Sequence, residues 1–301
     1  MSLPRPFDPD DIESLPVVQL MSAGPPIYEQ QVNRAWRGLV QAPGSVHAGF
    51  PAVLKFMPSS VKISIELGCS LASAALKLPV PRGMLALADP TDLQGMPADA
   101  KPIPGRSEVL CYASMLQWPQ DTMERVDKED QAVADFLWNR FCHSNVASPG
   151  AAWDELVANP DRHARNFIFD GTRYWLIDHD LSLKPLAEAM REMTGQAGRQ
   201  KVLEHRASRN QVATQLLQRR PNDHGMLAQP RTFEARKRAL EAQVIAMSKW
   251  KTGIPTLDAV LEDAETVVRG IILRLPALAL QLNERLEKPN GPLLWTPSTV
   301  S

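Results

Sequence analysis

The chain has 301 residues, 44% of them hydrophobic, and a formal net charge of −1. This length can bury one large core or two lobes, and the charge provides no overall attraction to nucleic acid or to an anionic membrane. Three cysteines are too few for a disulfide framework. Because they lie in apolar segments, we expect them to be reduced and buried: Cys69, Cys111 and Cys142.

No segment predicts export or membrane insertion. The first residues are proline-rich and acidic, and they lack the basic start and apolar stretch of a secretory signal. The most apolar late run, 271–282, is interrupted by Arg274 and Pro276 and is too short to span a bilayer. We therefore expect a cytoplasmic protein without a membrane anchor.

The first part of the chain predicts a small, β-rich unit. Residues 1–14 are interpreted as a flexible arm, and Ser22–Pro26 as the turn after a first strand. The apolar run Phe50–Phe56 predicts a strand that carries a single charge, Lys55. Beyond a turn, apolar residues spaced along one face predict a helix over Ile63–Leu78.

Glu66 lies near the start of this predicted helix, eleven residues after Lys55. Taken singly, a lysine on a strand is usually a solvated edge residue, and a glutamate early in a helix usually interacts with the helix dipole. The order strand, lysine, turn, helix, glutamate is also the order of the kinase ion pair, which holds the lysine against the α- and β-phosphates of ATP.

The middle of the chain alternates between irregular and regular segments. Residues 84–106 contain four prolines and are interpreted as an irregular connection. The apolar run Ser107–Leu116 predicts a strand that ends before Pro119. Helical spacing of apolar residues predicts a buried helix over Glu129–Asn145. Ser148–Gly150 would end this helix or mark a loop before Trp153–Val157.

The segment Asn159 to Asp180 is the part of the sequence that indicates a chemistry. Two short apolar runs flank Asp170-Gly171, and this pattern strongly predicts a β-hairpin. Because a hairpin brings its outer ends together, Asn166 before it and Asp178 after it should meet at one mouth. Asp161 lies in the loop that enters the hairpin.

These three residues match the needs of phosphoryl transfer. Transfer from ATP requires Mg²⁺ held against the phosphates and a group that orients the acceptor hydroxyl. Mg²⁺ prefers oxygen ligands and keeps several waters, so the Asp178 carboxylate and the Asn166 amide suffice as protein ligands. Asp161, five residues before the amide as in a kinase catalytic loop, is then free to accept a hydrogen bond from the hydroxyl.

The remainder of the chain is predicted to be mostly helical. Residues 184–230 carry a local excess of arginine and lysine, which could dock an acidic protein or a tRNA-like substrate. We favour the other interpretation, a solvated helical surface with interspersed opposite charges. Few aromatic residues lie among them, so we expect no direct nucleic-acid binding. Apolar periodicity over Phe233–Lys249 and Leu257–Leu286 predicts helices that complete a large lobe.

The chemistry-bearing segment resembles known kinases. Ile177-Asp178 after Asp-Arg-His-x-x-Asn is similar to phosphatidylinositol kinases, with His179-Asp180 in place of the more usual Phe-Gly. The stretch from Lys55 to Pro81 resembles the N-terminal lobe of short HipA-like kinase domains, and the motif-level similarity covers roughly residues 15 to 185. Four polar residues follow the Asn-x-Asp-x-His-x-x-Asn pattern of the HipA-like catalytic loop: Asn159, Asp161, His163 and Asn166.

The resemblance implies an α+β, two-lobed protein-kinase-like fold. Residues 1–14 would form a flexible N-terminal arm, 15–117 a small β-rich N-lobe, and 118–301 a mostly helical C-lobe. It implies ATP and Mg²⁺ as cofactors and a serine or threonine of a cytosolic protein as the phosphate acceptor. In a toxin-like role the chain would also have an antitoxin-like regulatory partner.

The resemblance also implies roles for the residues of the catalytic loop. Asp161 would be the catalytic base, and His163 would support the loop by hydrogen bonding. Asn166 and Asp178 would bind the metal. Asp180 adds a second carboxylate that could share this coordination.

In the N-lobe, the resemblance implies that Lys55, paired with Glu66, contacts the phosphates. The end of the strand over 107–116, with Ala113 and Met115, would present backbone groups to adenine. Ser22–Pro26, with one glycine and two prolines, stands where many kinases have a flexible glycine-rich loop.

Two other functions remain open. A nucleotide-binding pseudokinase that acts as an interaction module would explain the proline-containing first loop. A metal-dependent phosphohydrolase would use His163, Asp178, His179 and Asp180 as transition-metal ligands. The hydrolase interpretation needs further histidines and leaves Lys55 without a role.

Overall fold

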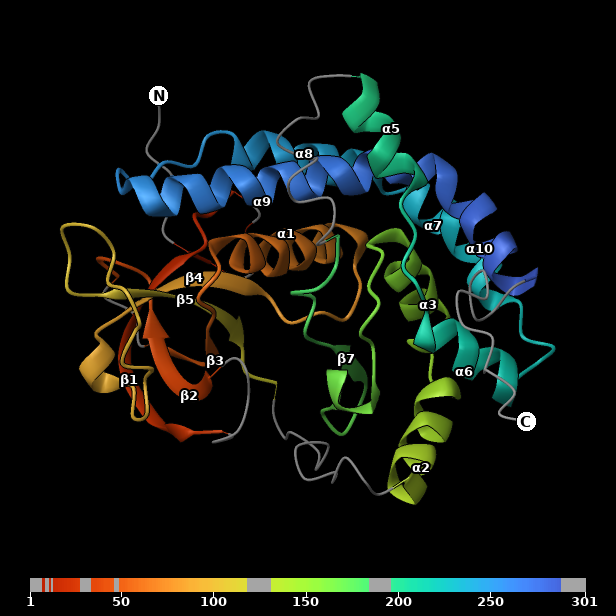
Figure 1. Ribbon diagram of the computed structural model, residues 1–301, viewed down its shortest axis with the longest axis horizontal. Helices are drawn as coiled ribbons and strands as arrows, with labels where there is room; N and C mark the ends of the chain where they lie inside the picture. The colour runs from red at the N-terminus through yellow and green to blue at the C-terminus, as the bar shows by residue number, and fades with distance from the viewer. Residues whose placement is uncertain are drawn as a thin grey trace, which may run out of the picture. The chain divides into compact units, whose positions relative to one another are not determined.

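The computed structural model describes residues 7–8, 11, 13–27, 34–45, 49–117, 131–183 and 196–287. The chain is a mixed α+β protein, with its strands mainly in the N-terminal part and its helices mainly in the C-terminal part (Figure 1). It divides into two compact units. The first is Met1–Trp118 with Lys237–Ile272, and the second is Pro119–Arg236 with Leu273–Ser301.

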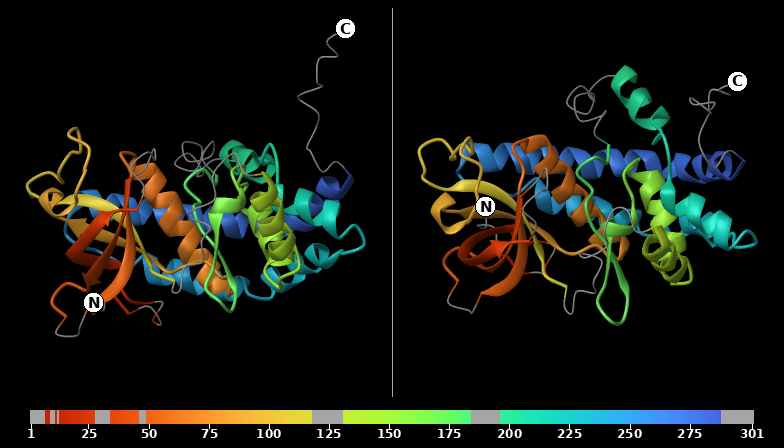
Figure 2. Two further views of the ribbon diagram at one scale, coloured as in Figure 1. Left: turned by 90° about the horizontal axis from the view of Figure 1, so that it is seen from below. Right: turned by 60° about the horizontal axis from the view of Figure 1, so that its bottom comes forward.

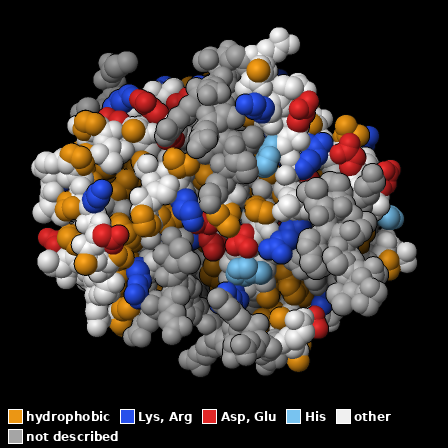
Figure 3. All heavy atoms as spheres, viewed as in Figure 1, with side chains coloured by type: hydrophobic (Ala, Val, Ile, Leu, Met, Phe, Trp, Pro, Cys, Tyr) orange, Lys and Arg blue, Asp and Glu red, His pale blue; other side chains and the backbone are white. Residues whose placement is uncertain are grey.

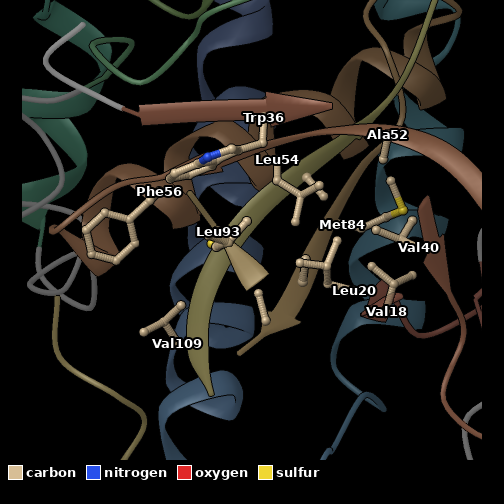
Figure 4. Packing of buried hydrophobic residues seen from close by; sticks show 14 of the residues in the cluster. Val18, Leu20, Trp36, Val40, Ala52, Leu54, Phe56, Met84, Leu93 and Val109 are labelled. Carbon is tan, nitrogen blue, oxygen red and sulfur yellow. The ribbon is translucent and has the colours of Figure 1, made fainter. Parts of the chain in front are cut away.

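The first unit contains a closed five-stranded barrel in the order β1-β2-β3-β5-β4. Neighbouring strands are antiparallel, except that β1 and β4 pair in parallel and so close the barrel. Apolar side chains from every strand fill its interior, and Figure 4 shows Trp36, Leu54 and Met84 among them. The strands are β1 (Val17–Pro26), β2 (Arg34–Gln41), β3 (Phe50–Phe56), β4 (Gly83–Ala88) and β5 (Val109–Met115).

Helix α1 (Ser60–Leu76) lies against β4 and β5 of this barrel. Its C-cap is Lys77, which has a left-handed backbone (φ 58°). The N–H groups of Lys77 and Leu78 donate to the carbonyls of Ala74 and Ser73 in the last turn. The predicted helix over Ile63–Leu78 is therefore confirmed with both of its ends shifted towards the N-terminus. The shift moves Glu66 out of the first turn, which contains no acidic residue.

Helices α8 (Lys237–Met247) and α9 (Pro255–Arg274) run beside α1 (Figures 1 and 2). A Cβ atom on Gly68 of α1 would lie 2.6 Å from the Cβ of Val267, so only glycine allows this approach to α9. The expectation that these late helices complete the large lobe is therefore wrong for residues 237–272, which belong to the same compact unit as the barrel. The physical reason is that α1 is buried around most of its circumference and needs cover on the side away from the sheet.

The second unit surrounds the predicted hairpin, which is confirmed as β6 (Phe167–Phe169) paired with β7 (Tyr174–Leu176). The Asp170 carboxylate accepts the N–H groups of Thr172 and Arg173 at 2.8 and 2.9 Å and so fixes the turn. Stacked rings of Phe141 and Phe167, with centroids 4.4 Å apart, form part of the core. The helices are α2 (Gln131–Cys142), α3 (Ala147–Leu156), α5 (Gln196–Glu204), α6 (Gln211–Arg219), α7 (Gln229–Glu234) and α10 (Leu278–Glu287).

Short 3-10 turns join several of these elements. They are η1 (Pro90–Asp92), η3 (Ala164–Asn166), η5 (Gly225–Ala228) and η6 (Leu275–Ala277). The last of them, which contains Pro276, separates α9 from α10. The single helix expected over Leu257–Leu286 is therefore two helices, because proline cannot continue the ladder of helical hydrogen bonds.

Two expectations about the N-terminal part are wrong. The described residues of the 1–14 arm are packed rather than free: the Phe7 ring lies 5.5 Å from Phe50, and the Ser14 hydroxyl donates to the carbonyl of Asp8 at 2.9 Å. Ser22–Pro26 is not a turn but the second half of β1, where bulges absorb the prolines while the strand stays paired with β2. The β1–β2 connection falls at 28–33, outside the described residues.

Two further expectations fail in the middle of the chain. Residues 84–88 belong to β4, which is buried along its whole length, and only the residues after it form the irregular connection. Ser148–Gly150 does not end a helix but lies in the first turn of α3. Proline is tolerated there because N–H groups in a first turn have no helical acceptor.

The three cysteines are buried and form no disulfide bond, as expected. Burial raises the pKa of the Cys111 thiol to about 12. In the part of the chain that the structure describes, no helix has both the length and the apolar character needed to cross a membrane.

Candidate functional site

The first unit brings together the lysine and the glutamate that the sequence pairs. Lys55 Nζ lies 3.1 Å from Glu66 Oε1, and the glutamate side chain is only 3% exposed. Lys55 lies on β3, a central strand whose neighbours β2 and β5 place Ala35 and Tyr112 opposite it. A solvated edge lysine and a dipole-binding glutamate are therefore both excluded, and the pair is a partly buried ion pair between strand and helix.

The adenine-contact residues lie at the end of β5. Ala113 is flanked on both sides, opposite Leu54 of β3 and Met84 of β4. The N–H of Met115 donates to the carbonyl of Arg82 at 2.9 Å, so this donor is already used within the unit. Any adenine contact made by Met115 through its N–H would require this bond to break, and a role for these two residues stays a prediction.

In the second unit, the catalytic loop is closed by its own amide side chains. Asn159 Oδ1 accepts the N–H of Asp161 at 3.0 Å, and Asn166 Nδ2 donates to the carbonyl of Asp161 at 2.9 Å. The loop therefore wraps around the Asp161 backbone and leaves its carboxylate 37% exposed. Since the nitrogen of the Asn166 amide is used in this way, its oxygen is the atom that could bind a cation.

The hairpin mouth has the predicted form. The N–H of Ile177 donates to the carbonyl of Asn166 at 3.0 Å, which brings Asp178 to the end of the catalytic loop. Asp178 is half-buried and has a left-handed backbone (φ 64°). A non-glycine residue in this region is strained, and such residues concentrate at functional sites.

Arg162, a residue without a predicted role, lies at the centre of this arrangement. Its guanidinium is fully buried and binds the Asp154 carboxylate of α3, with Nη2 2.9 Å from Oδ1 and Nε 3.0 Å from Oδ2. Its Nη1 donates to the carbonyls of Asn166 and Ile177. One side chain thus joins α3 to both ends of the hairpin. Arg162 lies between Asp161 and His163 in the catalytic-loop motif, and this position in the sequence could have indicated its role.

His179 is a buried hydrogen-bonding residue rather than a metal ligand of the kind that the hydrolase needs. Its Nε2 faces two donors, the indole N–H of Trp153 at 3.0 Å and Arg162 Nη2 at 3.0 Å. This nitrogen is therefore an acceptor already in use. Among the residues that the structure describes, no group of three or more His, Cys, Asp or Glu side chains is placed to hold a metal ion.

His163 makes a hydrogen bond within the loop. Its Nδ1 accepts the N–H of Arg165 at 3.3 Å, which begins the 3-10 turn over Ala164–Asn166. Burial lowers the pKa of His163 below its ordinary value of 6.5, with opposing effects from nearby charges such as Asp161. The ring is therefore held in the neutral form that can accept this hydrogen bond.

Several basic residues after position 196 pair with acidic residues, as expected for a solvated surface with interspersed opposite charges. On the face shown in Figure 3, the described Lys and Arg side chains are interspersed with Asp and Glu side chains. Residues 184–195 lie outside the described part. Three of the observed ion pairs are Arg206–Glu284, Arg219–Asp135 and Arg220–Asp223.

Arg209 differs from these basic residues because the acidic residue beside it is Asp161, the candidate base. Its Nε donates to the carbonyl of Pro160 at 2.7 Å, and its Nη2 lies 3.7 Å from Asp161 Oδ1. It comes from the segment between α5 and α6, and no spacing in the sequence connects it to the catalytic loop.

No protein-family model matches the chain, and no curated protein sequence does. Among solved structures, the chain is similar to a Helicobacter pylori proinflammatory kinase, CtkA, at 13% sequence identity and a TM-score of 0.40. The match covers 82% of this chain and 92% of that chain. At this TM-score the likeness carries no argument about function.

Proposed function

We propose that the chain is an ATP- and Mg²⁺-dependent kinase of HipA-like type that phosphorylates a serine or threonine of a cytosolic protein. The observation that carries the proposal is the ion pair between Lys55 and Glu66, 3.1 Å apart. A lysine on a central strand, held by a buried glutamate of the next helix, is the arrangement that fixes a lysine against the phosphates of ATP. No ordinary role of either residue on its own accounts for it.

The catalytic loop supports the same function independently. Asp161 has a fixed backbone and an exposed carboxylate, so it is able to accept the proton of an acceptor hydroxyl. The Asn166 amide oxygen and the Asp178 carboxylate are hard oxygen donors of the kind that Mg²⁺ prefers, and Asp180 could join them. When bound, Mg²⁺ would neutralise charge on the phosphates.

The test uses γ-radiolabelled ATP with Mg²⁺ and follows label on the chain itself or on a lysate protein. Asp161→Asn should lower transfer by about 10²–10⁴-fold, because general-base catalysis contributes that much, and Asp178→Asn should abolish it. The matched control is Asp135→Asn, an exposed aspartate of the same unit that pairs with Arg219. Equal labelling by wild type and Asp161→Asn would remove Asp161 from the role of base.

The lysine is tested separately. Lys55→Met and Glu66→Gln should both weaken nucleotide-dependent thermal stabilisation, because each breaks the ion pair. Lys101→Met, at an exposed lysine of the same unit, should leave it unchanged. Stabilisation by ATP without any transfer would favour the pseudokinase, and phosphatase activity with Mn²⁺ and no nucleotide would favour the hydrolase.

A further inference from the structure

Arg209 is attached to the catalytic loop through a neutral group rather than through a charge. Its Nε donates to the carbonyl of Pro160 at 2.7 Å, a strong hydrogen bond, while Nη2 stays 3.7 Å from Asp161 Oδ1, beyond hydrogen-bond distance. The side chain is 61% exposed. The guanidinium is thus anchored at one corner, and its remaining N–H groups lie beside the candidate base.

A buried framework fixes the backbone from which Arg209 extends. The next residue, Asn210, is fully buried and caps α6 by accepting the N–H of Ala213 at 3.0 Å. Its Nδ2 donates to the carbonyl of Ala151 at 2.8 Å and to Glu155 Oε2 at 3.1 Å. Arg209 is therefore held against α3, and it is more than a surface residue on a loose connection.

The same end of α3 also holds the catalytic loop. Asp154 binds Arg162 of the loop, and its neighbour Glu155 binds Asn210 and, at 2.9 Å, Arg285 of α10. Two adjacent acidic residues therefore set the position of Asp161 from one side and of Arg209 from the other. This shared support is what brings residues so distant in sequence to one place.

Stability gives little reason for this arrangement. An exposed ion pair at this distance adds almost nothing to folding, and Pro160 could have its carbonyl satisfied by water. What the arrangement does provide is a positive charge next to the carboxylate that would receive the acceptor proton. The charge is available to an anion, because the guanidinium is 61% exposed and, among the residues that the structure describes, its hydrogen bond is the one from Nε to Pro160.

We propose that Arg209 is a catalytic residue that binds the phosphoryl group during its transfer; this inference rests on the proposed function. The acceptor hydroxyl oxygen forms a bond to the γ-phosphorus, and its proton passes to the Asp161 carboxylate. The bond from the γ-phosphorus to the oxygen that bridges the β-phosphorus breaks, and that oxygen leaves with the electron pair as part of ADP. Negative charge on the oxygens of the transferring group is stabilised by the Arg209 guanidinium.

The dimensions of the reaction agree with this role. An acceptor oxygen lies about 2.6–3.2 Å from its base and about 3–3.5 Å from the phosphorus that it attacks. The phosphoryl group therefore lies on the order of 6 Å from the Asp161 carboxylate. Because Arg209 Nη2 is 3.7 Å from the same carboxylate, the guanidinium can reach the phosphoryl group when that group lies on the Arg209 side of Asp161.

The experiment measures steady-state transfer from γ-radiolabelled ATP to casein or to the chain itself, over a range of ATP concentrations. Arg209→Ala should lower kcat on the order of 10²-fold, as loss of one charge-stabilising donor does, with little change in KM for ATP. Arg209→Lys should retain part of the rate, because an ammonium keeps the charge without the fork of donors. Arg206→Ala, which removes a nearby arginine paired with Glu284, is the matched control and should behave as wild type.

Two further readouts separate catalysis from structure. Added guanidinium ion should restore part of the Arg209→Ala rate, and the thermal midpoint of this variant should equal that of wild type. A loss of rate that comes with a lower midpoint and no rescue would overturn the inference in favour of a structural role. Faster transfer by Arg209→Ala would also overturn it, because the arginine would then block the acceptor.

The failure of this inference is distinguishable from the failure of the proposed function. If wild type and Arg209→Ala transfer at equal rates, the inference is wrong and the kinase assignment stands. If wild type transfers no label to casein, to itself or to a lysate protein, both are wrong.

Discussion

Asp154 is fully buried, and its carboxylate is the counter-ion of the equally buried Arg162. Burial raises the pKa of the Asp154 carboxyl, while the charge and hydrogen bonds of Arg162 oppose that rise. Replacing Asp154 by asparagine keeps the size and one acceptor oxygen but removes the charge. The variant therefore leaves a guanidinium in the interior without an anion.

Removing one partner of a buried pair costs about 3–5 kcal/mol, because the remaining charge stays desolvated. Asparagine retains one hydrogen bond, so we expect the lower end of this range for Asp154→Asn. One kcal/mol corresponds to about 2–4 °C in the thermal midpoint of a chain of this size. The midpoint should accordingly fall by about 6–12 °C.

Thermal unfolding followed by circular dichroism measures this shift. The matched control is Asp135→Asn, whose exposed pair with Arg219 should contribute only about 0–1 kcal/mol. A double-mutant cycle with Arg162→Met should give a clear coupling energy, because the two side chains share one network. A midpoint within about 2 °C of wild type for Asp154→Asn would refute the reasoning, since it would correspond to less than about 1 kcal/mol.

The same substitution should affect transfer beyond its effect on folding. Arg162 also donates to the carbonyls of Asn166 and Ile177, so a weakened guanidinium loosens both ends of the hairpin. At a temperature where Asp154→Asn is fully folded, we expect reduced phosphoryl transfer. Normal transfer there would show that the pair serves folding alone.

Three further predictions concern titration and packing. Burial lowers the pKa values of His163 and His205 below 6.5 in the folded chain. As the pH falls below 6.5, the unfolded chain therefore binds protons before the folded chain does, and the free energy of unfolding decreases. His163→Gln and His205→Gln should each reduce this decrease. Gly68→Ala should lower the free energy of unfolding by about 1–3 kcal/mol, because the added methyl group overpacks the contact with Val267. Gly150→Ala should raise it in urea unfolding, because its Cβ would meet nothing closer than 3.5 Å and alanine favours the helix. Iodoacetamide should not modify Cys111, whose thiol pKa is about 12, until the chain is unfolded, and rapid native modification would contradict its burial.

Much of the fold could be predicted where neighbours in sequence decide it. The Asp170-Gly171 hairpin, the strand that carries Lys55 and the helix that carries Glu66 all follow from turn chemistry and apolar periodicity. Predictions failed at proline and glycine, as in Ser22–Pro26, where bulges keep the strand paired. At such residues long-range pairing, which local pattern cannot reveal, overrides the local preference.

The candidate site also contains residues that local sequence predicts and residues that only the fold reveals. Asp161, Asn166 and Asp178 could be chosen because fixed spacings around one hairpin determine which backbone ends meet. Asp154 could not, because its role exists only through Arg162, and a carboxylate in a helix has no pattern that marks it as buried.

By itself the sequence determined the local elements and the order of their polar residues, since these depend on interactions between residues a few positions apart. Only the tertiary structure decided which strands close the barrel, that residues 237–272 belong to its unit, and that Arg209 reaches the loop at Pro160, 49 residues away in the chain. Such contacts depend on the packing of whole elements against one another. Packing is a property of three-dimensional shape that no spacing along the chain encodes.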